Sequence, residues 1–236
     1  MHSQRPKTTD GHLRERRLLV TIDGPAGAGK STVAKLLALR LGYLYLDTGA
    51  LYRAVAWKVR TSGVDPSDHE AVAKLLPSTT VTMEYHPERA RVSVEKQDVT
   101  EEIRTPEISR LASVVSAIPA VREWLLPVQR RIGSAGGVVA EGRDLGTRVF
   151  PAAEVKFFLE ADMEVRAARR HRELTTAGHA APLNETRQDI QTRDTQDRSR
   201  DIAPLVPASD ASVVDTSDLT VEQVVDRMMA VIAAKL

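Results

Sequence analysis

The feature of the sequence that most constrains its fold is a glycine-rich octapeptide, GPAGAGKS, which runs from Gly24 to Ser31. An apolar run, 18–22, precedes it, and a helical pattern, 31–41, follows it. This is the G-x-x-x-x-G-K-[ST] pattern in the strand, turn and helix context that a phosphate-binding loop requires. Glycines let successive backbone N–H groups point inward, and the N-terminus of the next helix adds a positive field. The octapeptide therefore predicts a site for the phosphates of a nucleotide.

Two side chains of this loop have predictable roles. Lys30 is placed to reach the β- and γ-phosphates as a mobile positive charge, and the Ser31 hydroxyl is placed to meet Mg²⁺. We expect the phosphates of the nucleotide to be held by Gly24, Pro25, Ala26, Gly27, Ala28, Gly29, Lys30, Ser31 and Thr32.

The composition excludes several other classes of protein. The chain has 33 basic and 32 acidic residues among 236, so its net charge of +1 gives no reason to expect nucleic-acid or membrane binding. The absence of cysteine excludes disulfides, thiolate catalysis and cysteine-based zinc sites. No apolar stretch approaches the ~18 residues needed to span a bilayer. Residues 1–16 are polar and are predicted to be a disordered leader rather than a signal peptide.

Hydrophobic patterning predicts an α/β fold. Apolar runs typical of strands alternate with helical segments, which indicates a five-stranded parallel sheet with helices on both faces. The predicted strands are 17–22, 43–46, 137–140, 155–159 and 212–215. Residues from about 78 to 99 instead alternate with period two around a turn at 86–88, which predicts a small inserted antiparallel β subdomain.

Ligands of such sheets bind beyond the carboxyl ends of the strands, so the segments that follow the strands are expected to share one cleft. The segment that starts at Asp47 opens a helix, and its N-terminus together with Arg53 suits a second anion. In the segment from Glu141 to Asp144, the acid is able to hold Mg²⁺ through water and Arg143 to clamp a phosphate. The alternative interpretation of the first segment is a capped helix with a surface arginine, and that of the second is a simple turn.

Two charged helical faces complete the candidate site. Arg166, Arg169 and Arg170 have i, i+3, i+4 spacing on a helix predicted over 163–176. They are able to close over a transferring phosphoryl group, or they form a solvated face. A helix is predicted over 185–200, where Arg193, Asp197 and Arg200 share a face that either clamps a polar ligand or is paired internally.

Taken together, these segments resemble the bacterial cytidylate (CMP/dCMP) kinases of the nucleoside monophosphate kinase superfamily. The resemblance runs from about Leu18 to Leu236. It rests on IDGPAGAGKS (22–31), DTGALYR (47–53), EIRT (102–105), EGRDLGT (141–147), and the stretch 193–200 followed by APL (203–205). The GRD-x-GT stretch makes it far more specific than the phosphate loop alone.

The resemblance implies transfer of a phosphoryl group from ATP to CMP or dCMP, with Mg²⁺. It implies a P-loop kinase domain over 17–236, with a nucleoside-monophosphate-binding subdomain at about 64–107 and a short helical lid at about 165–184. Residues Thr48, Ser113, Arg122 and Asp144 would face the cytosine, Arg53 and Arg143 would hold its phosphate, and Arg193, Asp197 and Arg200 would contact ribose and phosphate.

The predicted mechanism needs no general base, because the acceptor is an ionised phosphate oxygen. Catalysis is then in-line positioning plus charge neutralisation by Lys30, Mg²⁺ and the lid arginines Arg166, Arg169 and Arg170. We expect a cytoplasmic monomer that binds small nucleotides and neither nucleic acid nor membrane.

Other classes of protein remain open from the sequence. A different nucleotide kinase would carry the same phosphate loop. A GTP-dependent switch would carry an Asn-Lys-x-Asp motif, which the chain lacks. A nucleic-acid binder would use the basic leader, but the balanced charge of the rest of the chain disfavours this.

Overall fold

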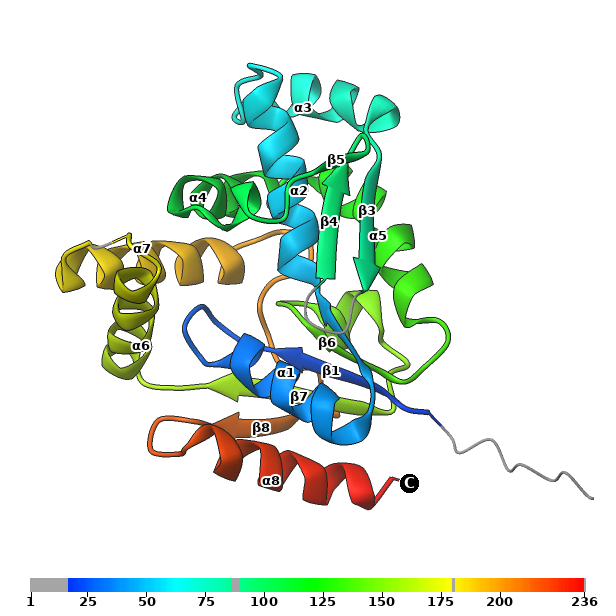
Figure 1. Cartoon of the computed structure of the whole chain (residues 1–236), viewed down its shortest axis with the longest axis vertical. Helices are drawn as coiled ribbons and strands as arrows, with labels where there is room; N and C mark the ends of the chain where they lie inside the picture. The colour runs from blue at the N-terminus through cyan, green and yellow to red at the C-terminus, as the bar shows by residue number, and fades with distance from the viewer. Residues whose placement is uncertain (1–16, 86–89, 180, 236) are drawn as a thin grey trace, which may run out of the picture.

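A five-stranded parallel sheet with strand order β2-β6-β1-β7-β8 lies at the centre of the protein in the computed structural model (Figure 1). The structure describes residues 17–85, 90–179 and 181–235. The strands are β1 (Leu19–Asp23), β2 (Leu44–Asp47), β6 (Val138–Glu141), β7 (Val155–Glu160) and β8 (Ser212–Asp215). The predicted parallel sheet is confirmed. The predicted leader, 1–16, lies outside the described residues.

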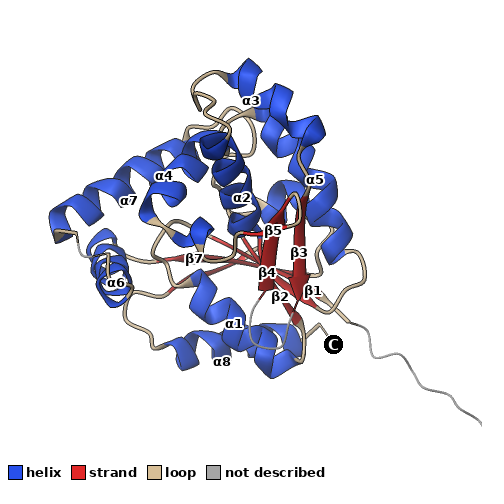
Figure 2. Cartoon of the chain, turned by 45° about the horizontal axis from the view of Figure 1, so that its top comes forward, coloured by secondary structure: helices blue, strands red, loops and turns tan. Residues whose placement is uncertain are grey.

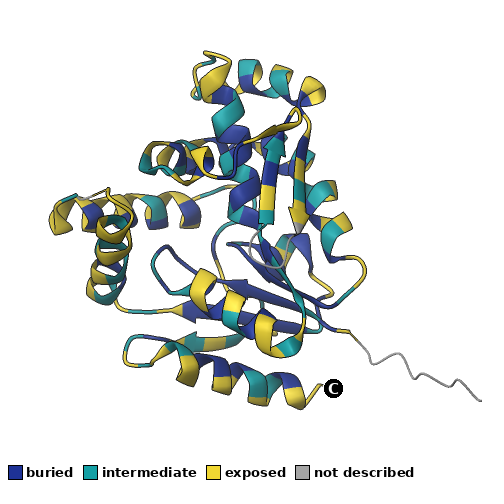
Figure 3. Cartoon of the chain, viewed as in Figure 1, coloured by how far each residue is buried: buried dark blue, intermediate teal, exposed yellow. Residues whose placement is uncertain are grey.

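Helices cover both faces of this sheet (Figure 2). On one face, α1 (Lys30–Leu41) and α8 (Val221–Ala233) bury apolar side chains against β1 and β7, with Leu37 and Met228 fully enclosed. On the other face, α5 (Pro119–Gly133) and a π-helical turn (Leu145–Val149) pack over β2 and β6. The central strands have buried side chains on both faces, as a parallel sheet requires (Figure 3).

Local sequence fixes several helix ends. Gly42 caps α1 in the left-handed conformation, with φ of 63°. Thr220 and Gln223 form a capping box at the start of α8. The charged helix predicted over 185–200 is α7 (Leu183–Arg198), so Arg200 lies beyond its C-terminus. This is a correction to the prediction; helix ends are set by capping and tertiary contacts, which charge spacing does not report.

A second core lies beside the sheet. Its elements are α2 (Thr48–Thr61), α3 (His69–Leu75), a three-stranded antiparallel sheet and α4 (Pro106–Val115). The strands are β3 (Val81–Tyr85), β4 (Ala90–Val94) and β5 (Gln97–Asp98). These elements share one hydrophobic cluster, in which Leu51 and Val99 are fully buried, and α5 joins it. The predicted antiparallel insertion is confirmed; its predicted turn, 86–88, lies outside the described residues.

The remaining helices are α6 (Met163–Thr176) and α7, which pack against each other at one side of the molecule (Figure 1). Both are exposed over much of their surface (Figure 3). Within the described part of the chain, no single helix is long and apolar enough to cross a membrane. Only α4 and α5 taken together, across a bend of 103°, meet that criterion.

Candidate active site

The phosphate loop is held rigidly between β1 and α1. Gly24 has a φ of 146°, and a Cβ atom built there would lie 2.0 Å from the carbonyl oxygen of Leu159 in β7. A Cβ atom on Gly27, where φ is 78°, would lie 2.8 Å from the carbonyl oxygen of Arg166. Only glycine fits either position, so the loop can pack directly against the elements that follow β7.

Lys30 is the first residue of α1, and its side chain folds back over the loop. Its Nζ donates a hydrogen bond to the carbonyl oxygen of Pro25 at 2.7 Å. Burial, followed by the neighbouring positive charge of Arg143, lowers the pKa of Lys30 to about 7. A phosphate bound at the loop would favour the charged form of Lys30 and raise its pKa again. The ammonium group is therefore held most firmly in its charged form when phosphate is bound.

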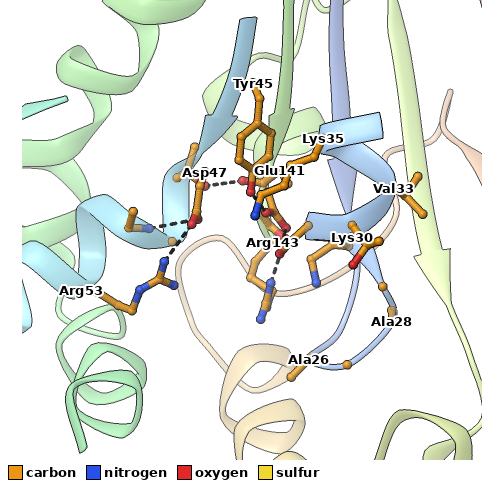
Figure 4. Close-up of a pocket in the computed structure, with 18 of the residues that line it drawn as sticks. Ala26, Ala28, Lys30, Val33, Lys35, Tyr45, Asp47, Arg53, Glu141 and Arg143 are labelled. Carbon is orange, nitrogen blue, oxygen red and sulfur yellow. Dashed lines mark hydrogen bonds and ion pairs between the residues drawn. The ribbon is translucent and has the colours of Figure 1, made fainter. Parts of the chain in front are cut away.

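A carboxylate network lies next to the loop. The Ser31 hydroxyl donates to Glu141 Oε2 at 3.0 Å, and the Tyr45 hydroxyl donates to Glu141 Oε1. Figure 4 shows the Tyr45 ring directed at Glu141, with Lys30 and Arg143 close by. Burial, followed by the nearby charge of Asp47, raises the pKa of Glu141.

This network fits Mg²⁺ by its chemistry, since a hydroxyl and a carboxylate are the oxygen ligands that the ion prefers. No group of three or more His, Cys, Asp or Glu side chains able to hold a metal is found among the residues described. A magnesium ion at Ser31 would therefore take its other ligands from water and the phosphates of a nucleotide, as is usual for nucleotide-bound Mg²⁺.

A cleft of about 1240 Å³ extends from the phosphate loop to the space between α2, α4 and α7. This exceeds the ~300–1,000 Å³ of a typical small-ligand pocket, so the cleft has room for two nucleotides. All nine residues predicted to contact the acceptor line it: Thr48, Arg53, Ser113, Arg122, Arg143, Asp144, Arg193, Asp197 and Arg200. Of the predicted loop residues, 26–32 line it, and Gly24 and Pro25 do not.

Near the loop, Arg53 Nη2 contacts Asp47 Oδ2 at 2.8 Å, and Arg143 Nε contacts Asp197 Oδ2 at 2.9 Å. Burial works to raise the pKa of Asp47, but the Arg53 guanidinium holds it below its usual value. Burial, with Arg143 second, lowers the pKa of Arg193 to about 10.

Several buried guanidinium nitrogens of the cleft have no hydrogen-bond partner among the described residues. They are the Nε atoms of Arg53, Arg122, Arg193 and Arg200. Buried donors without an acceptor are rare in folded proteins, because each carries a desolvation penalty. Four such guanidinium groups lining one cleft indicate that an anion belongs there.

At the far end of the cleft, polar side chains from four elements meet. The Arg122 guanidinium of α5 forms a buried ion pair with Asp144 and donates to the carbonyl oxygen of Ser116 at 3.0 Å. Ser113 Oγ donates to Gln196 of α7 at 2.9 Å. Thr48 Oγ1 donates to the carbonyl oxygen of Glu141 at 2.7 Å. This end offers both donors and acceptors in fixed places.

The three arginines of α6 are not brought together. The Arg169 guanidinium donates to the hydroxyl oxygen and to the carbonyl oxygen of Thr216. Arg170 pairs with Glu173 at 2.8 Å. Both arginines also line the cleft. Arg166 does not line the cleft, because its guanidinium lies under the phosphate loop in a buried pair with Asp194. The i, i+3, i+4 spacing correctly predicts that the three arginines lie on one side of a helix. It does not predict which residues of other elements each guanidinium contacts.

Sequence reasoning missed three residues. Tyr45 orients Glu141, and Asp47 caps α2 by accepting from the Ala50 amide at 3.0 Å. Asp23 accepts backbone N–H bonds from Leu145 at 2.9 Å and Gly146 at 2.8 Å, which fixes the segment after Asp144. Asp23 and Asp47 are the last residues of β1 and β2. An acid at the carboxyl end of a parallel strand lies beside the ligand cleft, so this position in the sequence could have identified both as site residues.

A parallel sheet with a phosphate loop after its first strand, and a second basic pocket facing that loop, defines the class of P-loop kinases. The family model for cytidylate kinase matches residues 20–234, so the chain belongs to the cytidylate kinase family.

Individual relatives agree with this assignment. The chain is 49% identical to a cytidylate kinase of Pelotomaculum thermopropionicum, covering 91% of this chain and 96% of that one. It is 47% identical to a cytidylate kinase of Geobacter sp. (strain M21), covering 95% and 96%. Among solved structures, an uncharacterized protein from Eubacterium ventriosum has a TM-score of 0.52 at 10% identity, over 93% of this chain and 99% of that one. The last similarity concerns the fold alone.

Proposed function

We propose that the chain transfers the γ-phosphoryl group of ATP to CMP or dCMP, giving ADP and CDP or dCDP, in pyrimidine nucleotide metabolism. The observation that carries this proposal is the two-ended cleft. The phosphate loop and Lys30 lie at one end, and the buried Arg122–Asp144 pair lies at the other. Membership of the cytidylate kinase family supports the same activity.

The donor side uses the loop N–H groups and Lys30 to bind the β- and γ-phosphates of ATP. Mg²⁺, when bound through Ser31 and through water on Glu141, would supply charge neutralisation between the phosphates. Arg169 and Arg170, which line the cleft from α6, are placed to neutralise the transferring group. No general base is needed, since the attacking oxygen of a nucleoside monophosphate is already ionised.

The acceptor side divides into a phosphate end and a base end. Arg53 and Arg143 hold the acceptor phosphate, and Arg193, Asp197 and Arg200 contact phosphate and ribose. Thr48, Ser113, Arg122 and Asp144 face the cytosine. The unpaired Nε atoms of Arg53, Arg193 and Arg200 support the first assignment, and the mixed donors and acceptors at Asp144 support the second.

In this proposal residues 17–236 form one kinase domain. A nucleoside-monophosphate-binding subdomain covers about 64–107. Its side chains belong to a hydrophobic cluster separate from that of the sheet, which they share with α2, α4 and part of α5, and this second core supports a distinct subdomain. A lid covers about 165–184, where α6 meets α7. We further propose a cytoplasmic monomer that binds small nucleotides rather than nucleic acid or membrane.

The test is ADP release from ATP and Mg²⁺, measured in parallel with AMP, GMP, UMP, CMP, dCMP and dTMP as acceptors. We expect turnover with CMP and dCMP to exceed that with every other acceptor. Preferred turnover of a purine monophosphate or dTMP would assign the chain to another nucleotide kinase activity. ADP release that no monophosphate stimulates would contradict the proposal.

A further inference from the structure

We propose that Arg166 and Asp194 form a positioning pair that couples the donor site to the acceptor site. Occupation of the phosphate loop by ATP would be transmitted through this pair to α7, and would raise the affinity of the cleft for the acceptor. The inference rests on the proposed function for its choice of nucleotides, and on the contacts of one guanidinium for its mechanism.

The Arg166 guanidinium joins three segments of the chain. Its Nη1 donates to Asp194 Oδ2 in α7 at 2.6 Å and to the carbonyl oxygen of Ala26 in the phosphate loop at 3.0 Å. Its Nε donates to the carbonyl oxygen of Ala161, between β7 and α6, at 3.0 Å. Both charged side chains are 6% exposed. A single nitrogen atom therefore links the phosphate loop directly to α7.

Packing makes this link stiff. The Gly27 backbone lies so close to Arg166 that a Cβ atom on the glycine would stand 3.0 Å from the Arg166 Cβ. Ala26, Ala167 and Ile190 form a small buried apolar cluster across the loop, α6 and α7. Since interiors are close-packed, a shift of the loop is passed to its neighbours rather than absorbed.

Helix α7 carries acceptor residues immediately beside the pair. Arg193 precedes Asp194, and Asp197 follows it by about one turn; both line the cleft, and Asp194 does not. Asp197 in turn pairs with Arg143, at 2.9 Å, and with Arg200. A movement of α7 at Asp194 would therefore displace three of the groups assigned to the acceptor.

The Asp194 carboxylate depends on this one partner. Its Oδ2 pairs with Arg166, and its buried Oδ1 has no hydrogen-bond partner within the described residues. A buried carboxylate with one ion pair and no other support has its position set by that pair. Loss of the pair would remove the polar link between α7 and the phosphate loop while leaving the cleft-lining residues chemically intact.

The experiment measures CMP affinity by calorimetry, without a donor and with a non-hydrolysable ATP analogue and Mg²⁺ saturating the loop. The ratio of the two dissociation constants is the coupling between the sites. In the unmodified protein we expect the analogue to tighten CMP binding at least about fivefold. In Asp194→Asn we expect this ratio to fall to less than about twofold, with CMP affinity in the absence of donor little changed.

A second variant guards against unfolding. Arg166→Met with Asp194→Leu replaces the buried pair by apolar side chains, an exchange that other buried pairs tolerate, and it removes the hydrogen bond to Ala26. The matched control is Glu164→Gln, which breaks another α6–α7 ion pair, Glu164 Oε1 to Arg187 Nε at 2.7 Å, whose side chains are exposed. We expect the control to keep the full coupling ratio.

Retention of the full ratio in a folded variant, or a ratio near one in the unmodified protein, would overturn the coupling. An equal loss of coupling in Glu164→Gln would also overturn it, since the effect would then come from the contacts between α6 and α7 in general and not from the Arg166–Asp194 pair. CMP binding that is absent in every variant and in the unmodified protein would instead contradict the proposed function.

Discussion

Arg122 and Asp144 form an ion pair in which both side chains are almost completely buried, at 3% and 5% exposure. The pair joins α5 to the loop after β6, and the Arg122 guanidinium also lies 5.4 Å from the centre of the Tyr52 ring. Both charged groups line the cleft. A buried donor and a buried acceptor, held side by side, can read the edge of a base.

Substitution of Asp144 by alanine should therefore reduce the preference for cytosine. An ionised Asp144 accepts from the amino group of cytosine but opposes O4 of uracil, and Arg122 donates to cytosine N3 or O2 but opposes uracil N3–H. Each mismatch costs about 1–3 kcal/mol, so CMP should exceed UMP by roughly a hundredfold or more in kcat/KM. Asp144→Ala should lower the value for CMP much more than the value for UMP.

The control for this substitution is stability, because Asp144→Ala leaves Arg122 buried and unpaired, which costs about 3–5 kcal/mol in comparable cases. Asp144→Asn keeps the shape of the side chain and removes its charge, so it should narrow the preference in a more stable protein. Thermal unfolding identifies the folded variants. An unchanged CMP/UMP ratio in either folded variant would remove Asp144 from base recognition.

Lys30 provides the test of the donor site. Its Nζ contacts the phosphate loop, so Lys30→Ala should lower kcat at least about a hundredfold, the size of effect seen when one group that stabilises developing charge is removed. Lys74→Ala removes an exposed lysine that does not line the cleft and should change kcat only a few-fold. Steady-state kinetics on folded variants decide the matter; a Lys30→Ala enzyme with near-normal turnover would contradict the assignment.

The low pKa of Lys30 adds a dependence on pH. In the free protein its pKa is about 7, whereas phosphate oxygens would hold the proton and raise it. The bound state therefore carries more protons above pH 7, so ATP affinity should fall as pH rises from 7, by at most about tenfold per pH unit. Calorimetry in buffers of different ionisation enthalpy should show proton uptake, and less in Lys30→Met. If the unmodified protein and Lys30→Met take up the same number of protons when ATP binds, the protons go to the nucleotide and not to Lys30.

How far the sequence alone predicts this fold depends on whether the relevant pattern is local. The strand, glycine turn and helix around Lys30 are local in sequence, and this prediction is confirmed. The capping box at Thr220 is a local pattern of the same kind. The C-terminus of α7 depends on a less local contact, because the Leu205 N–H donates to the carbonyl oxygen of Asp197 in the last turn of the helix at 2.8 Å. The prediction therefore extended the helix to Arg200.

The same distinction applies to the candidate site. Four of the nine acceptor residues, Thr48, Ser113, Arg122 and Asp144, were named only through a family resemblance. The other five were also singled out by their places in the sequence, and the structure brings all nine to one cleft. Arg166 was grouped with Arg169 by helical spacing, but Asp194 binds it from 28 residues away in the sequence. Tyr45 was missed because its partner, Glu141, is 96 residues distant and reaches it only through the pairing of β2 with β6.

Tyr45 should affect the magnesium dependence of the reaction. Burial, with the charges of Asp47 and Glu141, raises the pKa of its phenol, so the hydroxyl stays protonated and donates to Glu141. Tyr45→Phe should leave Glu141 less well oriented and weaken Mg²⁺ binding about tenfold, as is usual when a partner of a metal-binding group is lost. Mn²⁺ binding to the protein with ATP, followed by electron paramagnetic resonance, measures this without turnover. The control is Tyr43→Phe, because the Tyr43 hydroxyl accepts a hydrogen bond from the Leu18 amide and does not contact Glu141. An equal loss of Mn²⁺ affinity in Tyr43→Phe would show that Tyr45 does not act through Glu141.

The last prediction concerns movement of the segment at about 165–184. Few side chains anchor this segment beyond its start: Arg166 and Ala167 are the only residues of α6 that are buried, and they pack against the phosphate loop and α7. Arg169 and Arg170, which follow them, line the cleft. Elements with little buried apolar surface open at low free energy, and a bridging ligand should close them over the donor and exclude water. Hydrogen exchange with a bisubstrate analogue should therefore slow at 165–184 and remain unchanged at the buried strand β6, Val138–Glu141. The analogue should protect the segment more than ATP or CMP alone, because closure needs contacts from both nucleotides. Exchange at 165–184 that is the same with and without the analogue would show that the segment is no lid.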